Sequence, residues 1–174
     1  MLHYDCYESP LGTLWMTGES GILTGLSFQP LMPETEHAHC PELDPVKAWL
    51  DCYFQGEVAA PDFSMAPYGT AFQQLIWQML LKIPYGKTCT YGELAKEAAS
   101  LMGKDRMSSQ AVGQAVGSNP IAIIIPCHRV LGVGGKLTGY AFGIDKKQAL
   151  LQHEQIREVE RCVTQTSDIL KQNG

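Results

Sequence analysis

The first 30 residues alternate between short strand-forming runs and turn-forming stretches. The runs YDCY (4–7), TLWMT (13–17) and ILTGLSF (22–28) are separated by ESPLG and GESG. Runs of this kind, bounded by glycine, serine and proline, are typical of strands joined by tight turns. The pattern therefore predicts a small antiparallel meander, and the proline-rich stretch 29–42 predicts a loop after it.

Helical spacing begins after this loop and dominates the second half of the chain. In DPVKAWLDCYFQG, Asp44 is the expected N-cap and apolar residues share one face. The segment 70–83 ends before Pro84, and TYGELAKEAASLM begins with Thr90 and Glu93 in the spacing of a capping box. With SSQAVGQAVGSNP after the polar turn GKDRM, this arrangement is typical of a helix-turn-helix, although helical hairpins that bind nothing share it.

The second helix of this pair consists largely of small residues, with Ala111, Gly113, Ala115 and Gly117 along it. Each glycine lowers the stability of a helix by about 1 kcal/mol, so a packing or binding requirement has to outweigh that cost. Two explanations fit equally well: the close approach of another backbone, or tight helix packing inside the protein.

The apolar run IAIII (121–125) predicts a short strand that ends at Pro126. GVGGK then predicts a turn, LTGYAFG a glycine-rich loop, and Asp145 the start of a final helix.

A length of 174 residues suffices for one core or two small domains. The stretch 57–69, with two prolines and a glycine, predicts a boundary between an N-terminal domain, 1–66, and a C-terminal domain, 67–156. A polar extension, 157–174, follows.

Composition and charge narrow the class of protein. Hydrophobic residues make up 45% and charged residues 18% of the chain, as in ordinary globular proteins. No window approaches the ~18 apolar residues of a membrane span, and the N-terminus has no signal-peptide pattern, so we expect a cytoplasmic protein. Residues 1–81 hold ten acids and one base, whereas 82–147 hold nine bases and four acids. A surface facing phosphates would carry such a basic segment, although a solvated face gives the same pattern.

The six cysteines, at 6, 40, 52, 89, 127 and 162, form no CxxC pair. They indicate thiols rather than a disulfide framework or a paired-ligand zinc site. His37, His39 and Cys40 cluster in HAHC, but the loop offers no second pair of ligands at a structural-zinc spacing. We therefore expect adventitious binding there at most, and no metal site.

Cys127, in the stretch IPCHRV, differs from the other cysteines. Burial is the default role of a thiol, but His128 and Arg129 beside it can favour a thiolate, and the glycine-rich loop after it can close over a bound group. Because neighbouring residues of a strand point to opposite sides, we expect His128 to act through a water, with Glu154 or Asp145 orienting its ring. A nucleophile is favoured, but spacing gives no substrate.

IPCHRV does not stand alone. Together with GYAFG and LLQHE after it, and NP and YGELA before it, it resembles the O6-alkylguanine-DNA alkyltransferases, also called methylated-DNA–protein-cysteine methyltransferases. With SPLG near the N-terminus, the similarity extends from Ser9 to Glu154. It implies an α/β (α+β) fold, in which a small antiparallel sheet with a helix, ribonuclease H-like, precedes a mainly helical winged helix-turn-helix domain.

The family's chemistry implies DNA repair by direct reversal. The protein would bind double-stranded DNA as a monomer through the minor groove and flip out O6-alkylguanine, at a cost of a few kcal/mol that weakened pairing reduces. A cysteine then takes the alkyl group, and O4-methylthymine is a further expected substrate. The S-alkylcysteine is not regenerated, so each molecule acts once, and no cofactor takes part.

The resemblance also assigns roles to residues. Cys127 is the alkyl acceptor, His128 the base that acts through water, and Glu154 the carboxylate that orients it. Tyr91 contacts the flipped base and Asn119 braces the active-site turn. The other implied substrate and DNA contacts are Val130 and Ala141 through their backbones, Tyr140 as a wall of the alkyl pocket, and Arg129 within the same motif.

Three features depart from the family's pattern. Gln110 stands where an arginine normally enters the base stack, and it lacks the charge and the stacking plane of a guanidinium. The stretch between Tyr91 and Gln110 is about five residues longer than usual, so Arg106 can substitute from the turn. Phe142 replaces a glycine and is expected to narrow the pocket. These departures predict methyl transfer with weaker DNA binding and poor tolerance of bulky alkyl groups.

Three alternatives remain at this point. An alkyltransferase-like protein would bind the lesion without transfer, typically with the cysteine replaced, but Cys127 is present. A Cys-His thiol hydrolase would need an oxyanion hole and would turn over repeatedly. A small DNA-binding regulator with a helix-turn-helix would leave PCHRV unexplained.

Overall fold

The computed structural model of the chain describes residues 1–31 and 38–154. These residues form two compact units. Among the described residues, the first comprises 1–69 and 120–124, and the second comprises 70–119 and 125–154. The predicted polar extension 157–174 lies outside the described residues. Within the described part, no helix is long and apolar enough to cross a bilayer.

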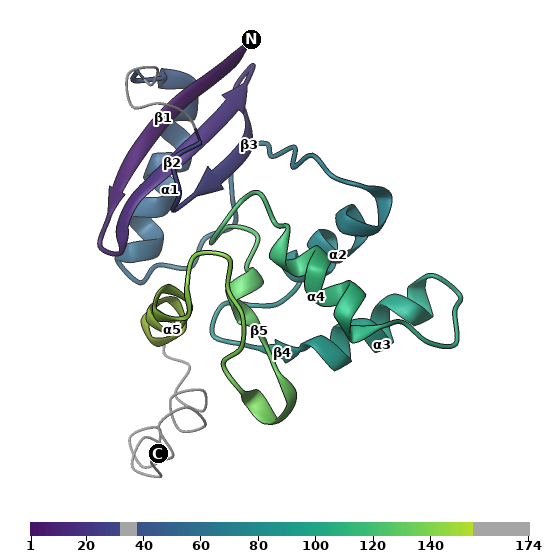
Figure 1. The fold of residues 1–174 in the computed structure, drawn as a ribbon. Coiled ribbons are helices and arrows are strands. Elements are labelled where there is room, and N and C mark those ends of the chain that lie inside the picture. The colour runs from purple at the N-terminus through teal and green to yellow at the C-terminus, as the bar shows by residue number, and fades with distance from the viewer. Residues whose placement is uncertain (32–37, 155–174) are drawn as a thin grey trace. The chain divides into compact units, whose positions relative to one another are not determined.

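The first unit is built on an antiparallel sheet, which confirms the predicted meander. Its strands are β1 (Leu2–Ser9), β2 (Gly12–Glu19) and β3 (Ile22–Ser27), hydrogen-bonded in that order. The helix α1 (Asp44–Phe54) runs along one face of the sheet (Figure 1). A Cβ atom on Gly18 would lie 2.6 Å from Cδ2 of Leu43 in the short 3-10 helix η2 (Pro41–Leu43), so a larger residue there would force the buried Leu43 side chain to shift.

The start of α1 differs from the prediction. Asp44 is the first helical residue rather than the N-cap, because η2 runs directly into the helix and places Leu43 at the cap position. The Asp44 carboxylate instead accepts a hydrogen bond from His39 Nε2 at 2.9 Å. The predicted apolar face of α1 is present, since Val46, Leu50 and Tyr53 are buried.

The run 121–125 is a buried coil, and the prediction of a strand there is wrong. Its residues are all buried, but only Ile121 forms a bridge, to Leu26 of β3, and Ile123 has a left-handed φ of 69° that a strand does not tolerate. The segment caps the edge of β3, since Leu26 N donates to Pro120 O and Ala122 N donates to Leu26 O, both at 2.9 Å. A short apolar run cannot be distinguished from other buried segments by periodicity alone.

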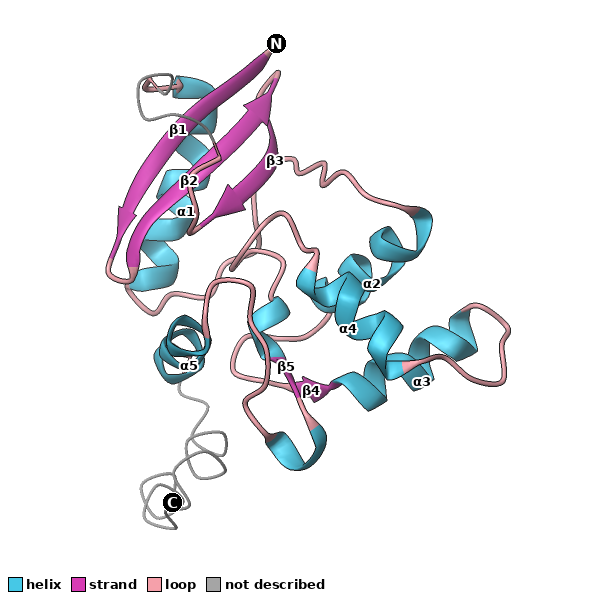
Figure 2. Cartoon of the chain, viewed as in Figure 1, coloured by secondary structure: helices cyan, strands magenta, loops and turns pink. Residues whose placement is uncertain are grey.

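The second unit contains the remaining helices. They are α2 (Ala71–Leu81), α3 (Tyr91–Leu101), α4 (Ser109–Gly117) and α5 (Ile144–His153). As Figure 2 shows, α4 crosses between α2 and α3, and it packs against both. The Trp77 indole donates to the carbonyl of Ala115 at 2.9 Å and joins α2 to α4. A polar turn, residues 102–108, joins α3 to α4 as in a helix-turn-helix.

Side-chain caps explain where these helices begin. The hydroxyl of Thr70 caps α2 in a full capping box with Gln73, and Ser108 caps α4 by accepting from Gln110 N and Ala111 N. The hydroxyl of Thr90 caps α3 by accepting from Glu93 N at 3.1 Å, as the spacing predicts. The Glu93 carboxylate lies against the same hydroxyl at 3.1 Å.

The segments that carry the motif IPCHRV (125–130) lie between α4 and α5. The 3-10 helix η3 (Cys127–Arg129) leads into β5 (Val130–Leu131), which pairs in parallel with β4 (Cys89–Thr90). A second 3-10 turn, η4 (Val133–Gly135), and the loop 136–143 follow. The final helix begins at Ile144, one residue before the predicted start.

Both explanations offered for the small residues of α4 have support. Ala115 is buried on the side that packs against the neighbouring helices. A Cβ on Gly113 would meet only the Tyr91 ring, at 3.8 Å, and one on Gly117 would meet nothing within 4 Å. One side of α4 is therefore packed inside the unit. The side that carries Gly113 and Gly117 has no side chains projecting from these positions and leaves room for another backbone to approach.

Candidate active site

The turn η3 sends three consecutive buried side chains in different directions. Cys127 N donates to Ile125 O at 2.8 Å and Arg129 N donates to Pro126 O at 3.0 Å, which closes the turn. Successive residues of a 3-10 helix point about 120° apart. Cys127 therefore lines a pocket while His128 and Arg129 reach Glu154, and this geometry replaces the strand alternation assumed from the sequence.

Glu154 receives three hydrogen bonds in a buried network. His128 Nε2 lies 2.6 Å from one carboxylate oxygen, Arg129 Nε donates to the other at 2.7 Å, and Arg129 Nη2 donates at 3.2 Å. Burial favours the protonated acid, but the hydrogen bonds and charges of His128 and Arg129 outweigh it and lower the pKa of Glu154 to about 2. Glu154 is therefore an ionised acceptor at neutral pH.

This network fixes the state of the His128 ring. Burial lowers the pKa of His128, so the imidazole is neutral at pH 7. An ionised carboxylate can only accept a hydrogen bond, so Nε2 must carry the proton and Nδ1 must carry the lone pair. Nδ1 is buried and has no hydrogen-bond partner among the described residues. The ring thus presents a free basic nitrogen that is directed by Glu154.

The pocket at Cys127 has a volume of about 180 Å³. We call it the Cys127 pocket; its walls are Tyr91, Gly113, Val116, Gly117, Asn119, Cys127, Gly139, Tyr140, Ala141 and Phe142. The rings of Tyr140 and Phe142 meet edge to face, with centroids 5.5 Å apart. The pocket brings together six of the residues predicted from the sequence: Tyr91, Asn119, Cys127, Tyr140, Ala141 and Phe142.

The environment of Cys127 keeps it as a thiol at rest. Burial raises the pKa of Cys127, while a hydrogen bond from Asn119 and the charge of Lys147 oppose that rise. Asn119 also donates from Nδ2 to Ile125 O at 2.8 Å, so it ties the start of η3 to the end of α4. A thiol of this kind needs a base when it reacts, and His128 is the neutral base nearest to it in sequence.

Sequence reasoning missed Lys147, which is completely buried on α5. Its ammonium donates to the carbonyls of Thr138 at 2.7 Å and Gly139 at 3.0 Å, and lies 5.8 Å from the centre of the Tyr91 ring. Burial lowers the pKa of Lys147 to about 8. Lys147 stands three residues before Leu150 in a predicted helix, so the two residues share the apolar face of that helix. A lysine on an apolar face was the signal in the sequence that could have pointed to a buried cation.

Three of the predicted DNA contacts, Gln110, Arg106 and Arg129, do not line this pocket. Gln110 is exposed on the first turn of α4, and Arg106 is exposed on the turn before it. Arg129 points inward, because its guanidinium contacts Glu154 and donates to Ile83 O at 2.7 Å, which argues against a DNA contact by its side chain. The N–H group of Cys127 donates to Ile125 O and that of Val130 donates to Cys127 O, so neither N–H group is left to donate to a base.

The described part of the chain contains no cluster of metal ligands. No group of three histidine, cysteine or acidic side chains there is placed to hold a metal ion. His39 is hydrogen-bonded to Asp44 and Cys40 is buried, while His37 lies outside the described residues.

Comparison with known proteins identifies the two units. Residues 2–66 match the ribonuclease-like domain of 6-O-methylguanine DNA methyltransferase, and residues 71–156 match its DNA binding domain. The methylated-DNA–protein-cysteine methyltransferase of Mycobacterium tuberculosis is 42% identical over 161 residues, covering 90% of this chain and 94% of its own. The protein of the same name from Haemophilus influenzae is 40% identical over 171 residues, which cover 95% of this chain and 93% of that protein.

A solved structure agrees with these matches. The Mycobacterium tuberculosis OGT in complex with DNA has a TM-score of 0.77 and 42% identity, and the alignment covers 88% of this chain and 92% of that one. The overall fold of this chain is thus shared with that protein. The chain belongs to the 6-O-methylguanine DNA methyltransferase family.

Proposed function

We propose that this protein repairs alkylated DNA by direct reversal, moving the alkyl group from O6 of guanine to the sulfur of Cys127. O4-methylthymine is a second substrate. The observation that carries the proposal is the neutral, Glu154-directed imidazole next to a buried cysteine that lines a small pocket of the DNA-binding domain. The product is a thioether, and no group in the site can regenerate the thiol, so each molecule acts once.

The proton of the thiol passes to His128. Nδ1 accepts it through a water, and the imidazolium that forms is stabilised by ionised Glu154. The thiolate attacks the alkyl carbon, the sulfur–carbon bond forms, and the electron pair of the breaking O6–carbon bond remains on the guanine. Burial raises the pKa of Tyr91, so its hydroxyl stays protonated and donates a hydrogen bond to the leaving base.

The small size of the Cys127 pocket supports base flipping. With a volume of about 180 Å³ the pocket has no room for a base pair, so in this proposal the guanine leaves the duplex and enters it alone. The carbonyls of Cys127 and Val130 and the backbone of Ala141 offer acceptors and donors for its edge. The low glycine side of α4 lets the backbone approach the minor groove, and Gln110 on the first turn fills the space that the base leaves.

Arg129 and Lys147 position the groups that react or bind, without contacting the substrate themselves. Arg129 keeps Glu154 ionised and anchors it against Ile83. Lys147 ties down the carbonyls of Thr138 and Gly139, which fixes the loop that carries Tyr140 and Phe142, and its charge favours the thiolate. Phe142 limits the alkyl group to small sizes, because its ring packs edge to face against Tyr140 in the pocket wall and takes up space there.

One experiment tests the transfer directly. The protein is incubated with duplex DNA containing O6-methylguanine, and the intact chain and its peptides are weighed. We expect one added methyl group on the peptide that contains Cys127, and unchanged transfer in Cys89→Ala, where burial raises the pKa of the thiol to about 12. Binding without added mass would instead support a lesion-binding protein. The monomeric state that the resemblance implies and the cytoplasmic location expected from the sequence stay predictions.

A further inference from the structure

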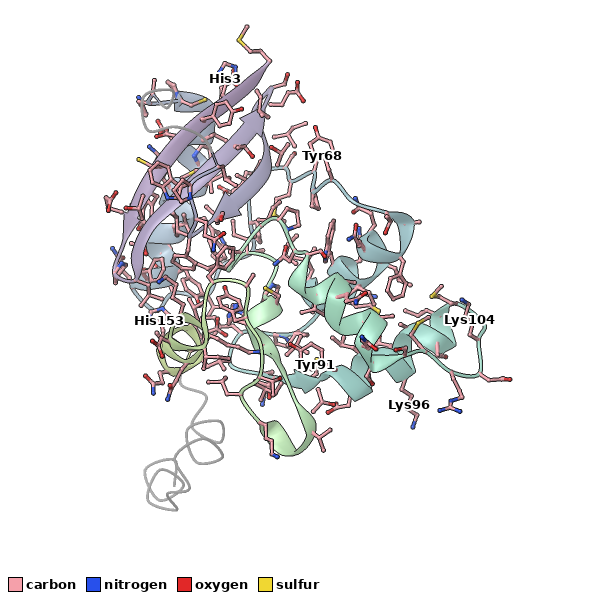
Figure 3. The ribbon with its side chains drawn as sticks, in the orientation of Figure 1. His3, Tyr68, Tyr91, Lys96, Lys104 and His153 are labelled. Carbon is pink, nitrogen blue, oxygen red and sulfur yellow. The ribbon has the colours of Figure 1, made fainter. Side chains whose placement is uncertain are left out.

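A second hollow in the DNA-binding unit is rich in positive charge. It lies between α3 and the start of α4, has a volume of about 480 Å³, and is separate from the Cys127 pocket. Lys96 of α3 and Lys104 and Arg106 of the turn contribute three cations, and the other polar side chains of its lining are Ser100, Asp105 and Ser109. We call this hollow the turn groove. In Figure 3, Lys96 and Lys104 lie at the same end of the unit.

The three cations of the turn groove are not used inside the protein. Lys96, Lys104 and Arg106 are exposed, and their side chains form no ion pair or hydrogen bond with any other described residue. Asp105 is the only acid in the groove, which leaves a surplus of two positive charges. Other cations of the unit are engaged, as Arg129 is with Glu154 and Lys147 is with loop carbonyls.

The N-terminus of α4 does not itself supply the groups that would bind an anion in the turn groove. Ser108 already accepts from the backbone N–H groups of Gln110 and Ala111 at 3.1 and 3.2 Å. The capacity to bind an anion therefore comes from the side chains of the groove, and it suits an extended polyanion better than a single small ion, because the cations are spread over a helix and a turn.

We propose that the turn groove binds the sugar-phosphate backbone of the same DNA, a few nucleotides from the lesion; this rests on the proposed function. The groove reaches Ser109, and the Cys127 pocket reaches Gly113 and Gly117 on the same helix. At 1.5 Å per residue these positions are roughly 6 to 12 Å apart along α4. Phosphates of one strand are spaced about 3.4 Å apart along the duplex axis, so the groove lies roughly two to four nucleotides from the flipped base.

This assignment gives Arg106 a different task from the one suggested by the sequence. Its side chain lines the turn groove together with Lys104, rather than the face of α4 that carries Gly113 and Gly117. Arg106 thus contacts phosphates and does not enter the base stack. Its contribution is a charge that binds regardless of base sequence.

The salt dependence of DNA binding tests the proposal. The full chain and the variant Lys96→Ala/Lys104→Ala/Arg106→Ala are titrated with a duplex containing O6-methylguanine at several salt concentrations. Each phosphate contact contributes about 0.9 to the slope of log affinity against log salt, so the variant's slope should be shallower by up to about 3. Between 50 and 200 mM salt, the affinity of the native chain should then fall roughly 40-fold more than that of the variant.

Three controls keep the result specific. Lys82→Ala/Lys87→Ala removes two exposed charges of the same unit outside the groove and should change the slope less. Asp105→Asn should tighten binding. Shortening the duplex on the side of the groove should abolish the difference between native chain and triple variant, whereas shortening the other side should not.

The outcomes separate this proposal from the proposed function. A triple variant with the slope of the native chain, or with no more change than the Lys82/Lys87 control, overturns the groove as a phosphate site. A normal rate of methyl transfer at saturating DNA shows that the variant is folded and that only binding has changed. If Cys127 of the native chain takes up no methyl group, the proposed function is overturned. The salt dependence of DNA binding would still show whether the turn groove contacts phosphates.

Discussion

Replacing Glu154 by glutamine tests the buried network at its centre. Glu154→Gln keeps the size of the side chain and removes its charge. The carboxylate accepts hydrogen bonds from His128 Nε2, Arg129 Nε and Arg129 Nη2 at 2.6, 2.7 and 3.2 Å. A carboxamide keeps one acceptor and turns an N–H₂ group toward one of these donors. The guanidinium of Arg129 then stays buried without a counter-charge.

Two independent arguments give the size of the effect. Removing one partner of a buried ion pair costs about 3–5 kcal/mol. The pKa of Glu154 is about 2 in the folded protein against an ordinary value of 4.5, and at about 1.4 kcal/mol per pKa unit the ionised form contributes about 3 kcal/mol. The free energy of unfolding of a folded domain is about 5–15 kcal/mol in total. The variant should therefore fold, but it should unfold at a lower denaturant concentration than the native chain.

Urea unfolding between pH 7 and pH 2 measures this contribution. The folded pKa of Glu154 is lowered, so its stabilisation is complete above the unfolded pKa and is lost as pH falls from about 5 through about 2. The difference in stability between native chain and variant should therefore be largest at pH 7 and shrink in acid. Glu97→Gln, at an exposed carboxylate, is the matched control. A loss below about 1 kcal/mol at pH 7, or a difference that does not depend on pH, would refute the reasoning.

Other substitutions test the pocket, the DNA contact and the buried lysine. Phe142→Gly should raise the rate on O6-benzylguanine relative to O6-methylguanine roughly tenfold or more; equal gains on both substrates would contradict the steric role. Gln110→Arg should tighten binding to lesion DNA about fivefold, from about 1 kcal/mol of stacking, and unchanged affinity in a gel-shift titration counts against it. Lys147→Met should shift the reaction of Cys127 with iodoacetamide to higher pH and slow methyl transfer, because the cation that favours the thiolate is gone; an unshifted pH profile would leave Lys147 a structural residue only.

Local patterns explain what could be predicted from the sequence. The strands of the meander, the cap at Thr90 and the spacing of the helices depend on residues only a few positions apart, and these features are confirmed. The pairing of Cys127, His128 and Glu154 came from resemblance to a family, and the geometry brings His128 and Glu154 within 2.6 Å.

The features that were missed depend on distant partners. The run 121–125 satisfies its backbone partly against Leu26 of β3, about 95 positions earlier in the chain, so no local pattern shows that it is a coil. The guanidinium of Arg129 bonds to the carbonyl of Ile83, 46 residues away, and a basic residue beside a catalytic motif was more simply assigned to DNA. Which nitrogen of His128 is basic depends on the ionisation of Glu154, which only burial and contacts determine.

The helix α5 and the residue that caps its C-terminal end hold two of the supporting side chains. Lys147 lies in the first turns of α5 and Glu154 is the C-cap, seven residues or about two turns and about 10 Å further along. One anchors the pocket loop and the other directs the base, so any tilt or fraying of α5 disturbs substrate fit and proton removal together. Heat should thus inactivate the protein in an all-or-none fashion, without a population that binds the lesion correctly and has merely lost its base.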